Sequence, residues 1–140
     1  MINQILRDAV SGWRLTERLL RLTLPLLQYQ EEDFKTMSFS MISEHRKPLG
    51  FISWHDVQSS PDALTLHGLY INTLAQARGL GKQLLRYSER HARSVGVTKL
   101  ELKAWRDAEP YFQHLGFSEK NKMRQENEYP VLLYREIHRV

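Results

Sequence analysis

The chain has 140 residues and no cysteine; 41% of its residues are hydrophobic, 26% are charged, and its formal net charge is +4. This length predicts one domain, residues 1–140, with enough apolar residues for a core. The absence of cysteine excludes disulfides, thiolate metal sites and a cysteine nucleophile. The small positive charge favours anionic ligands. No sequence pattern typical of nucleic-acid binding accompanies it, so nucleic acid is not an expected partner.

The residues at the N-terminal end of this sequence are not expected to be a secretion signal. Residues Met1 to Gln4 lack the basic start and the apolar core of a secretion signal. The apolar stretch from Leu19 to Leu27 is interrupted by Arg21 and Pro25, so it is too short and too polar to span a bilayer. We therefore expect a soluble, cytoplasmic protein with no membrane partner.

The predicted elements begin with a short strand at residues 2–7 and a helix that starts at the N-cap candidate Ser11 and is interrupted at Pro25. Apolar residues spaced by three and four predict a long helix over 80–95, with Gly96 as its C-cap, and Asp107 caps a short helix ending at Leu115. Alternating apolar and polar residues predict the remaining strands at 34–43, 49–57, 64–71, 98–105, 117–124 and 131–137. The order predicts an α+β fold with a mixed, mostly antiparallel sheet of about seven strands, covered by helices on both faces.

A glycine-rich turn, Gly79-Leu80-Gly81, joins the strand at 64–71 to the long helix. The first amides of a helix lack intrahelical partners and carry the positive end of the helix dipole. Glycines remove the side chains that would hold a ligand away from the backbone, and Arg78 and Lys82 add positive charge. The unit therefore predicts a site for a phosphate or diphosphate.

Two common phosphate-binding motifs do not fit this turn. A Walker A loop needs Ser or Thr after its Gly-Lys pair, but Gln83 follows Gly81-Lys82. The dinucleotide-binding fingerprint needs a third glycine at the position of Leu84.

Two other motifs resemble those of the GNAT superfamily of N-acyltransferases. Residues Gln76 to Gly81 read QARGLG and match its Q/R-x-x-G-x-G/A acyl-CoA signature. Residues Ala108 to Phe117 resemble its A-x-x-x-[FY]-[FY]-x-x-L-G-F motif. The resemblance covers roughly residues 50–120. It implies the GNAT fold, in which the fourth and fifth strands of the sheet splay apart.

The resemblance also implies that the ligand is acetyl-CoA, the acyl donor, and that no metal is needed. The diphosphate would bind the main chain of the glycine-rich turn, and the acyl-pantetheine arm would pair with the central strand over 69–73. The cofactor-binding residues that it implies are Leu69, Tyr70, Ile71, Gln76, Ala77, Arg78, Gly79, Leu80, Gly81, Lys82 and Phe112.

His67 is the candidate general base. It lies on the central strand, at the offset from the acyl-CoA motif where arylalkylamine N-acetyltransferases carry a histidine. An unperturbed histidine pKa of about 6.5 suits proton collection near neutrality. In a regular strand its side chain shares a face with Leu69 and Ile71, so it need not point into the cleft. Glu44 and His55 are weaker alternatives.

Two positions depart from the superfamily's pattern. Thr65 stands where histone-type members carry a glutamate base. Phe112 stands where the resemblance implies a tyrosine that protonates the leaving thiolate. The adjacent Tyr111 is the candidate acid in its place, with Tyr134 or water as alternatives. Trp105 replaces an asparagine that touches pantetheine in many members.

These expectations predict an N-acetyltransferase that moves an acetyl group from acetyl-CoA to a primary amine in a ternary complex. The amine is a small molecule, an amino acid, or a peptide or protein. The alternative is a non-catalytic acyl-CoA-binding sensor or regulatory module. The acidic turn at residues 31–33 is expected to be solvated, with an acidic lip for the amine as its other interpretation. The sequence leaves a homodimer open.

Overall fold

The computed structural model describes residues 1–11, 18, 21, 24–25, 27–56, 61–76, 78–104, 108–119 and 131–137. Its helices are α1 (Ile2–Ser11), α3 (Asp33–Thr36), α4 (Leu80–Ser94) and α5 (Glu109–His114), with a 3-10 turn η1 (Thr73–Ala75). Its strands are β1 (Met37–Glu44), β2 (Lys47–His55), β3 (Ala63–Ile71), β4 (Lys99–Ala104), β5 (Ser118–Glu119) and β6 (Val131–Glu136). The expected α+β class is confirmed.

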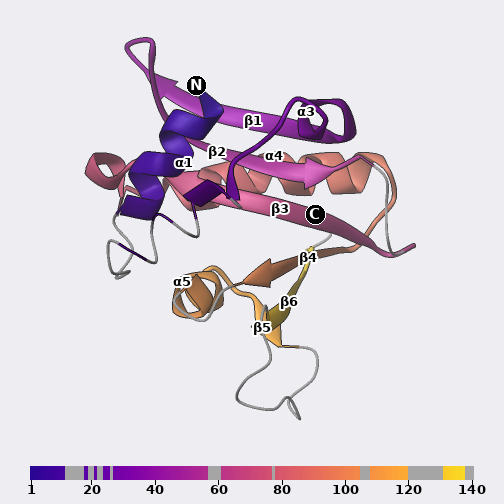
Figure 1. Ribbon diagram of the computed structural model, residues 1–140. Helices are drawn as coiled ribbons and strands as arrows, with labels where there is room; N and C mark the ends of the chain where they lie inside the picture. The colour runs from indigo at the N-terminus through magenta and orange to yellow at the C-terminus, as the bar shows by residue number, and fades with distance from the viewer. Residues whose placement is uncertain are drawn as a thin grey trace.

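The described strands form one six-stranded sheet in the order β1-β2-β3-β4-β6-β5 (Figure 1). The β3–β4 pair is parallel and every other neighbouring pair is antiparallel, as expected for a mixed, mostly antiparallel sheet. The chain order β3–α4–β4 explains the parallel pair, because a helix returns the chain to the same end of the sheet.

The predicted first strand at residues 2–7 is wrong, and so is the count of about seven strands for the described residues. Residues 2–11 form the helix α1. Its buried residues are Ile5, Leu6, Ala9 and Val10, and this spacing of three and four places them on one helical face. Ser11, the expected N-cap of the next helix, is instead the last residue of α1. Most of that expected helix lies outside the described residues, and so does Asp107, the expected cap of α5.

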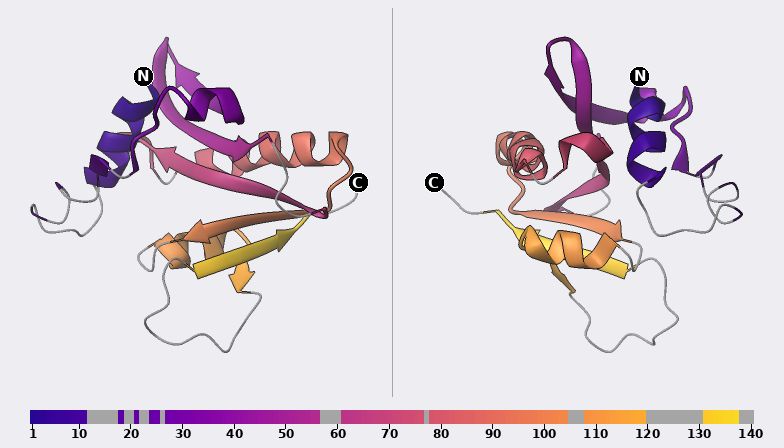
Figure 2. Two further views of the ribbon diagram at one scale, coloured as in Figure 1. Left: turned by 45° about the vertical axis from the view of Figure 1, so that its right-hand side comes forward. Right: turned by 90° about the vertical axis from the view of Figure 1, so that its left-hand side faces the viewer.

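Helices α1 and α4 lie on opposite faces of the sheet (Figure 2), and each packs against it through its own hydrophobic cluster. On one face, Leu84 and Leu85 of α4 pack with Leu64 and Leu100 of the sheet. On the other face, α1 contributes Leu6 to a smaller cluster. Burying a leucine side chain stabilises a fold by roughly 1.5–3 kcal/mol, so α4 is a firmly held element.

The sheet opens between β3 and β4, and this confirms the splay expected at the central strand. The two strands pair only at Ala63↔Lys99, Leu64↔Leu100 and Thr65↔Glu101. Beyond Thr65, the strand β3 continues to Ile71 with β2 as its described neighbour. Residues 66–71 therefore form no ladder with β4 in the described part of the chain.

The segment after β3 is tied to the layer of α1. The main-chain N–H of Thr73 donates to a carboxylate oxygen of Asp8 at 2.6 Å, and the Asn72 N–H donates to the Leu49 carbonyl at 2.7 Å. The Asn72 side-chain amide also donates to the Pro48 carbonyl at 2.9 Å. These bonds fix η1 and the turn that leads into α4.

The glycines predicted to stop two helices have left-handed backbones, with φ of 79° at Gly96 after α4 and 96° at Gly116 after α5. A residue with a Cβ would be strained at either position. No helix among the described residues is both long and apolar enough to cross a membrane.

Candidate functional site

The N-terminus of α4 presents main-chain donors at the end of the open β3 edge. Gly79 is the N-cap residue with φ 74°, and no described side chain caps the helix. The first i-to-i−4 bond of the helix joins the Gln83 N–H to the Gly79 carbonyl at 3.3 Å. The preceding amides, Leu80 to Lys82, therefore have no partner within the helix, and they carry the positive end of its dipole.

The two glycines of this turn differ in what surrounds them. A Cβ built on Gly79 would meet no atom within 4 Å. A Cβ on Gly81 would collide with the hydroxyl of Tyr111 from α5, and it would lie 3.3 Å from the Tyr111 Cζ atom. The expectation that both glycines leave the backbone bare therefore holds for Gly79, whereas Gly81 is buried against Tyr111 and Leu115 of the α5 segment.

The other residues of the motif take different positions. Leu80 is buried in the core beneath α4 and anchors the turn. Gln76 and Lys82 are exposed, and the Gln76 side-chain amide donates weakly to the Ile71 carbonyl at 3.4 Å. Arg78 pairs with Glu44 at the tip of the β1–β2 hairpin, with 2.5 Å between the guanidinium and carboxylate atoms. Ala77 lies outside the described residues.

A cleft of about 740 Å³ runs along α4 from Lys82 toward β6. Its walls include Arg86, His114 and Arg135. The Arg135 guanidinium pairs with Glu89, but Lys82, Arg86 and His114 form no ion pair with other described residues. The cleft therefore begins at the first turn of α4 and has Lys82 and Arg86 in its walls together with Glu89 and Glu136.

A β-bulge in β3 decides which way His67 faces. Ser53 of β2 pairs with Gly68, and the next residue, Trp54, pairs with Leu66, so His67 is the extra residue. The bulge shifts the alternation of side chains. Leu66 and Leu69 both face α4, whereas His67 contacts the other layer. The expectation that His67 shares a face with Leu69 and Ile71 is therefore wrong.

His67 lies among groups from three segments. Its Nδ1 is 3.4 Å from Nε2 of His55 on β2, and its ring meets the Tyr29 ring edge-on at 5.1 Å between centroids. Burial lowers the pKa of His67 below its usual value, and the charge of His55 lowers it further, while Asp33 of α3 acts in the opposite direction. The residue stays solvent-accessible, so a neutral imidazole is available at neutral pH.

The side chains packed beside His67 include Tyr29 and Ser53, which the sequence did not identify, and Tyr70, which was expected to bind the cofactor. The Tyr29 hydroxyl and Ser53 Oγ are hydrogen-bonded at 2.6 Å. A Cβ on Gly68 would lie 2.6 Å from the Tyr29 hydroxyl and 2.6 Å from the Tyr70 ring. Burial raises the pKa of Tyr70 to about 12 and also raises the pKa of Tyr29. Both hydroxyls thus stay protonated at neutral pH.

A second missed residue, Glu101, lies at the last paired position before the strands separate. Its carboxylate accepts a hydrogen bond from the Thr65 hydroxyl at 2.8 Å, and the residue is 9% exposed. Leu100 and Leu102 face α4, so alternation along β4 directs Glu101 toward the face of His67. A carboxylate therefore stands next to the position where the expected glutamate is replaced by Thr65.

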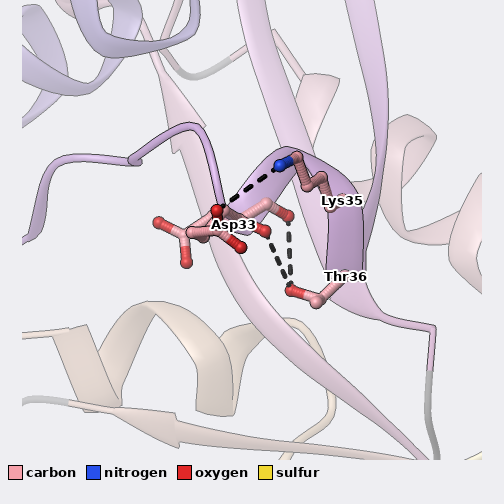
Figure 3. A network of polar contacts seen from close by, with 4 residues as sticks. Asp33, Lys35 and Thr36 are labelled. Atoms are coloured by element: carbon pink, nitrogen blue, oxygen red, sulfur yellow. Dashed lines mark hydrogen bonds and ion pairs between the residues drawn. The ribbon is translucent and has the colours of Figure 1, made fainter.

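The acidic turn before β1 is held by its own contacts. Figure 3 shows Lys35 and Thr36 bonded within this turn, with Lys35 Nζ at 3.4 Å from the Glu32 carboxylate. The Asp33 carboxylate accepts from the Gln30 N–H at 2.7 Å. Asp33 is the acid of this turn whose charge raises the pKa of His67.

Phe112 and Tyr111 point to different surroundings. Phe112 is buried in the core beside Phe117, with 5.8 Å between ring centroids. Tyr111 lies against Gly81 and is half exposed. Tyr134 lies on β6 opposite Glu101, and Trp105 lies outside the described residues. No three described His, Asp or Glu side chains come together as a metal site.

The comparisons with known proteins agree with this architecture. The model of the acetyltransferase (GNAT) family matches residues 2–117. The chain therefore belongs to the GNAT acetyltransferase family, whose members use acetyl-CoA. It is an enzyme of this family. The search of curated proteins returned no match to this sequence.

Many solved structures share the fold. The PaiA N-acetyltransferase from Thermoplasma acidophilum, solved with coenzyme A, has a TM-score of 0.73 at 14% identity, with 96% of this chain and 89% of that chain covered. Tetrahymena GCN5 has a TM-score of 0.66 at 21% identity, covering 97% and 86%. An aminoglycoside 6'-N-acetyltransferase from Enterococcus faecium has a TM-score of 0.65 at 17% identity, covering 98% and 93%.

Proposed function

We propose that the enzyme transfers the acetyl group of acetyl-CoA to a primary amine, which attacks the thioester directly in a ternary complex. The observation that carries this proposal is the junction of two features. The uncapped N-terminus of α4 begins where the splayed, half-paired edge of β3 ends. An anion-binding end next to an open strand edge fits a ligand that has a diphosphate followed by an amide-containing arm.

The donor would lie along this junction. The amides of Leu80 to Lys82 hold the diphosphate, and the arm lies along the edge of β3 that does not pair with β4. Lys82 and Arg86, the cations of the cleft that form no ion pair with other described residues, would face the nucleotide end. The Thermoplasma relative was solved with coenzyme A, which supports this class of ligand.

The amine would be deprotonated on the face of the sheet opposite α4. His67 accepts the proton, since burial and His55 favour its neutral form. Glu101 is the second candidate for this role, or the group that holds the ammonium before transfer. A main-chain amide near Ile71 on the free edge of β3 would donate to the developing oxyanion.

The leaving thiolate receives less help than the family pattern implies. Phe112 occupies the position of the implied tyrosine and has no hydroxyl to donate. A CoA thiol is acidic enough to leave as the thiolate, so the missing donor would slow the reaction without abolishing it. The same substitution favours the alternative function, a non-catalytic acyl-CoA-binding module.

Thermal unfolding with and without acetyl-CoA tests the first half of the proposal. Ligand at about 100 times its Kd should stabilise the fold by roughly 2.7 kcal/mol. A thiol-release assay across small amines, amino acids and lysine-containing peptides then tests transfer. Stabilisation with thiol release on one amine supports the enzyme. Stabilisation without release on any amine supports the binding module, and no stabilisation removes both.

A further inference from the structure

Tyr111 projects from α5 onto the first turn of α4. Its hydroxyl occupies the space that a Cβ at Gly81 would need, and its Cζ lies 3.3 Å from that Cβ position. Within the described part of the chain, this hydroxyl has no hydrogen-bond partner, and Phe112 is the aromatic ring that Tyr111 contacts. The hydroxyl of this half-exposed tyrosine therefore lies against Gly81, the second residue of α4.

The same hydroxyl is poorly placed to protonate a thiolate at the usual position of the family. That position falls on Phe112, which turns into the core toward Phe117. Adjacent residues of a helix point about 100° apart. Tyr111 consequently faces Gly81 and the end of α4. Burial raises the pKa of its hydroxyl, which keeps the proton available for donation.

We propose that Tyr111 is a ligand of the CoA diphosphate, with its O–H donating to a diphosphate oxygen held at the N-terminus of α4. The assignment rests on the proposed CoA site and replaces the general-acid role expected for this residue. It also gives Gly81 a second reason to be glycine, because any side chain there would displace the hydroxyl.

The test compares binding of two ligands that share the arm: CoA, and pantetheine, which lacks the diphosphate together with the 3′-phosphoadenosine. Kd values for CoA and for pantetheine are measured by calorimetry or competition in the wild type and in Tyr111→Phe. A hydrogen bond to a charged group contributes substantially to binding. We therefore expect Tyr111→Phe to reduce the ratio of the pantetheine Kd to the CoA Kd by about tenfold. An unchanged preference would overturn the assignment, since neither a general acid nor a packing residue distinguishes the two ligands.

Tyr87→Phe is the matched control. Tyr87 and Tyr111 are equally exposed, at 42%. Tyr87 lies on the flank of α4, where the Arg90 Cζ atom is 5.9 Å from the centroid of the Tyr87 ring. The preference for CoA should be unchanged in this variant. A reduction as large as that of Tyr111→Phe would mean that losing a tyrosine hydroxyl anywhere near α4 has this effect, and it would overturn the proposal.

A double-mutant cycle tests the geometry. Gly81→Ala should weaken CoA binding in the wild type, because the new methyl group expels the hydroxyl. It should weaken binding much less in the Tyr111→Phe background, where no hydroxyl is left to expel. Equal effects in the two backgrounds would contradict the contact between these residues.

Failure of this proposal is distinguishable from failure of the proposed function. If the wild type shows no binding of CoA, the function itself falls. If the wild type prefers CoA to pantetheine and Tyr111→Phe retains that preference, only the assignment of Tyr111 falls.

Discussion

The Nδ1 atom of His67 lies 3.4 Å from the Nε2 atom of His55, across the pairing of β3 with β2. The contact exists because the bulge at His67 turns its side chain away from α4. Two imidazoles this close disfavour a second positive charge. Burial first, and the His55 neighbour second, lower the pKa of His67 and favour the neutral form that a base requires.

The first prediction concerns His67 as that base. We expect His67→Ala to lower kcat by about 100-fold or more, the usual contribution of a general base, while the Kd of acetyl-CoA changes little. The measurement is steady-state kinetics with the best amine, alongside calorimetric binding. His91→Gln, on the opposite face beside Trp54, is the control. Wild-type turnover in His67→Ala would remove this residue from the mechanism.

The pH profile should report the environment of His67. Its pKa is lowered by burial and by His55, so kcat should rise with pH through an inflection below about 6.5 and then level off. His55→Asn removes the positive neighbour; the pKa of His67 should then rise, and the inflection should move to higher pH. A shift to lower pH, or none, would show that His55 does not act on the base.

Glu101 gives the third prediction. If its carboxylate holds the ammonium, Glu101→Gln should lower kcat/KM for the amine by about tenfold, in line with a charge-assisted hydrogen bond. Glutamine keeps an oxygen for the Thr65 hydroxyl, so folding is preserved. Glu119→Gln on β5 is the control. If Glu101→Gln lost more activity than His67→Ala, Glu101 would be the base. If Glu101→Gln lost no activity, Glu101 would have only a structural role.

The ion pair between Arg78 and Glu44 predicts that removing the Glu44 charge will raise the affinity for CoA. Both side chains are about half exposed, so the pair is weak, roughly 0–1 kcal/mol. Glu44→Gln should free Arg78 for the diphosphate and tighten CoA binding up to about fivefold at low salt, with less effect at high salt. Glu31→Gln removes the same charge elsewhere and is the control. Weaker CoA binding in Glu44→Gln would show that the pair supports the site.

A negative charge introduced at Gly81 should weaken acetyl-CoA binding more than a neutral side chain of the same size. Gly81→Glu and Gly81→Gln both add a side chain of the same size and both displace the Tyr111 hydroxyl, but only the first places a carboxylate near the diphosphate. We expect Gly81→Glu to abolish stabilisation by acetyl-CoA in thermal unfolding and Gly81→Gln to reduce it. Full stabilisation of Gly81→Glu would mean that the diphosphate binds elsewhere.

The sequence predicted the strand–turn–helix unit because its signals are local. Gly79, the apolar spacing of Leu80 to Leu85, and the glycine stop at Gly96 all act within a few residues of the chain. The helix α1 could have been predicted too, since Ile5, Leu6, Ala9 and Val10 follow helical spacing. Residues 2–7 alone are too short to show that period.

The remaining features depend on contacts between distant segments. The bulge at His67 arises from the register of β3 against β2, which no pattern within 63–71 encodes. The partners of Gly81 and Thr65 come from α5 and β4. Such contacts are set by packing, so the sequence supplied His67 and Tyr111 as candidates without their surroundings.

The most direct test follows the main-chain amides of α4 by NMR while CoA is added to the wild-type protein. An anion accepting from an amide shifts the resonance of that proton strongly. The largest downfield shifts should fall on Leu80, Gly81 and Lys82, and inorganic pyrophosphate should produce the same pattern. Saturating CoA binding with these three resonances unmoved would contradict the account.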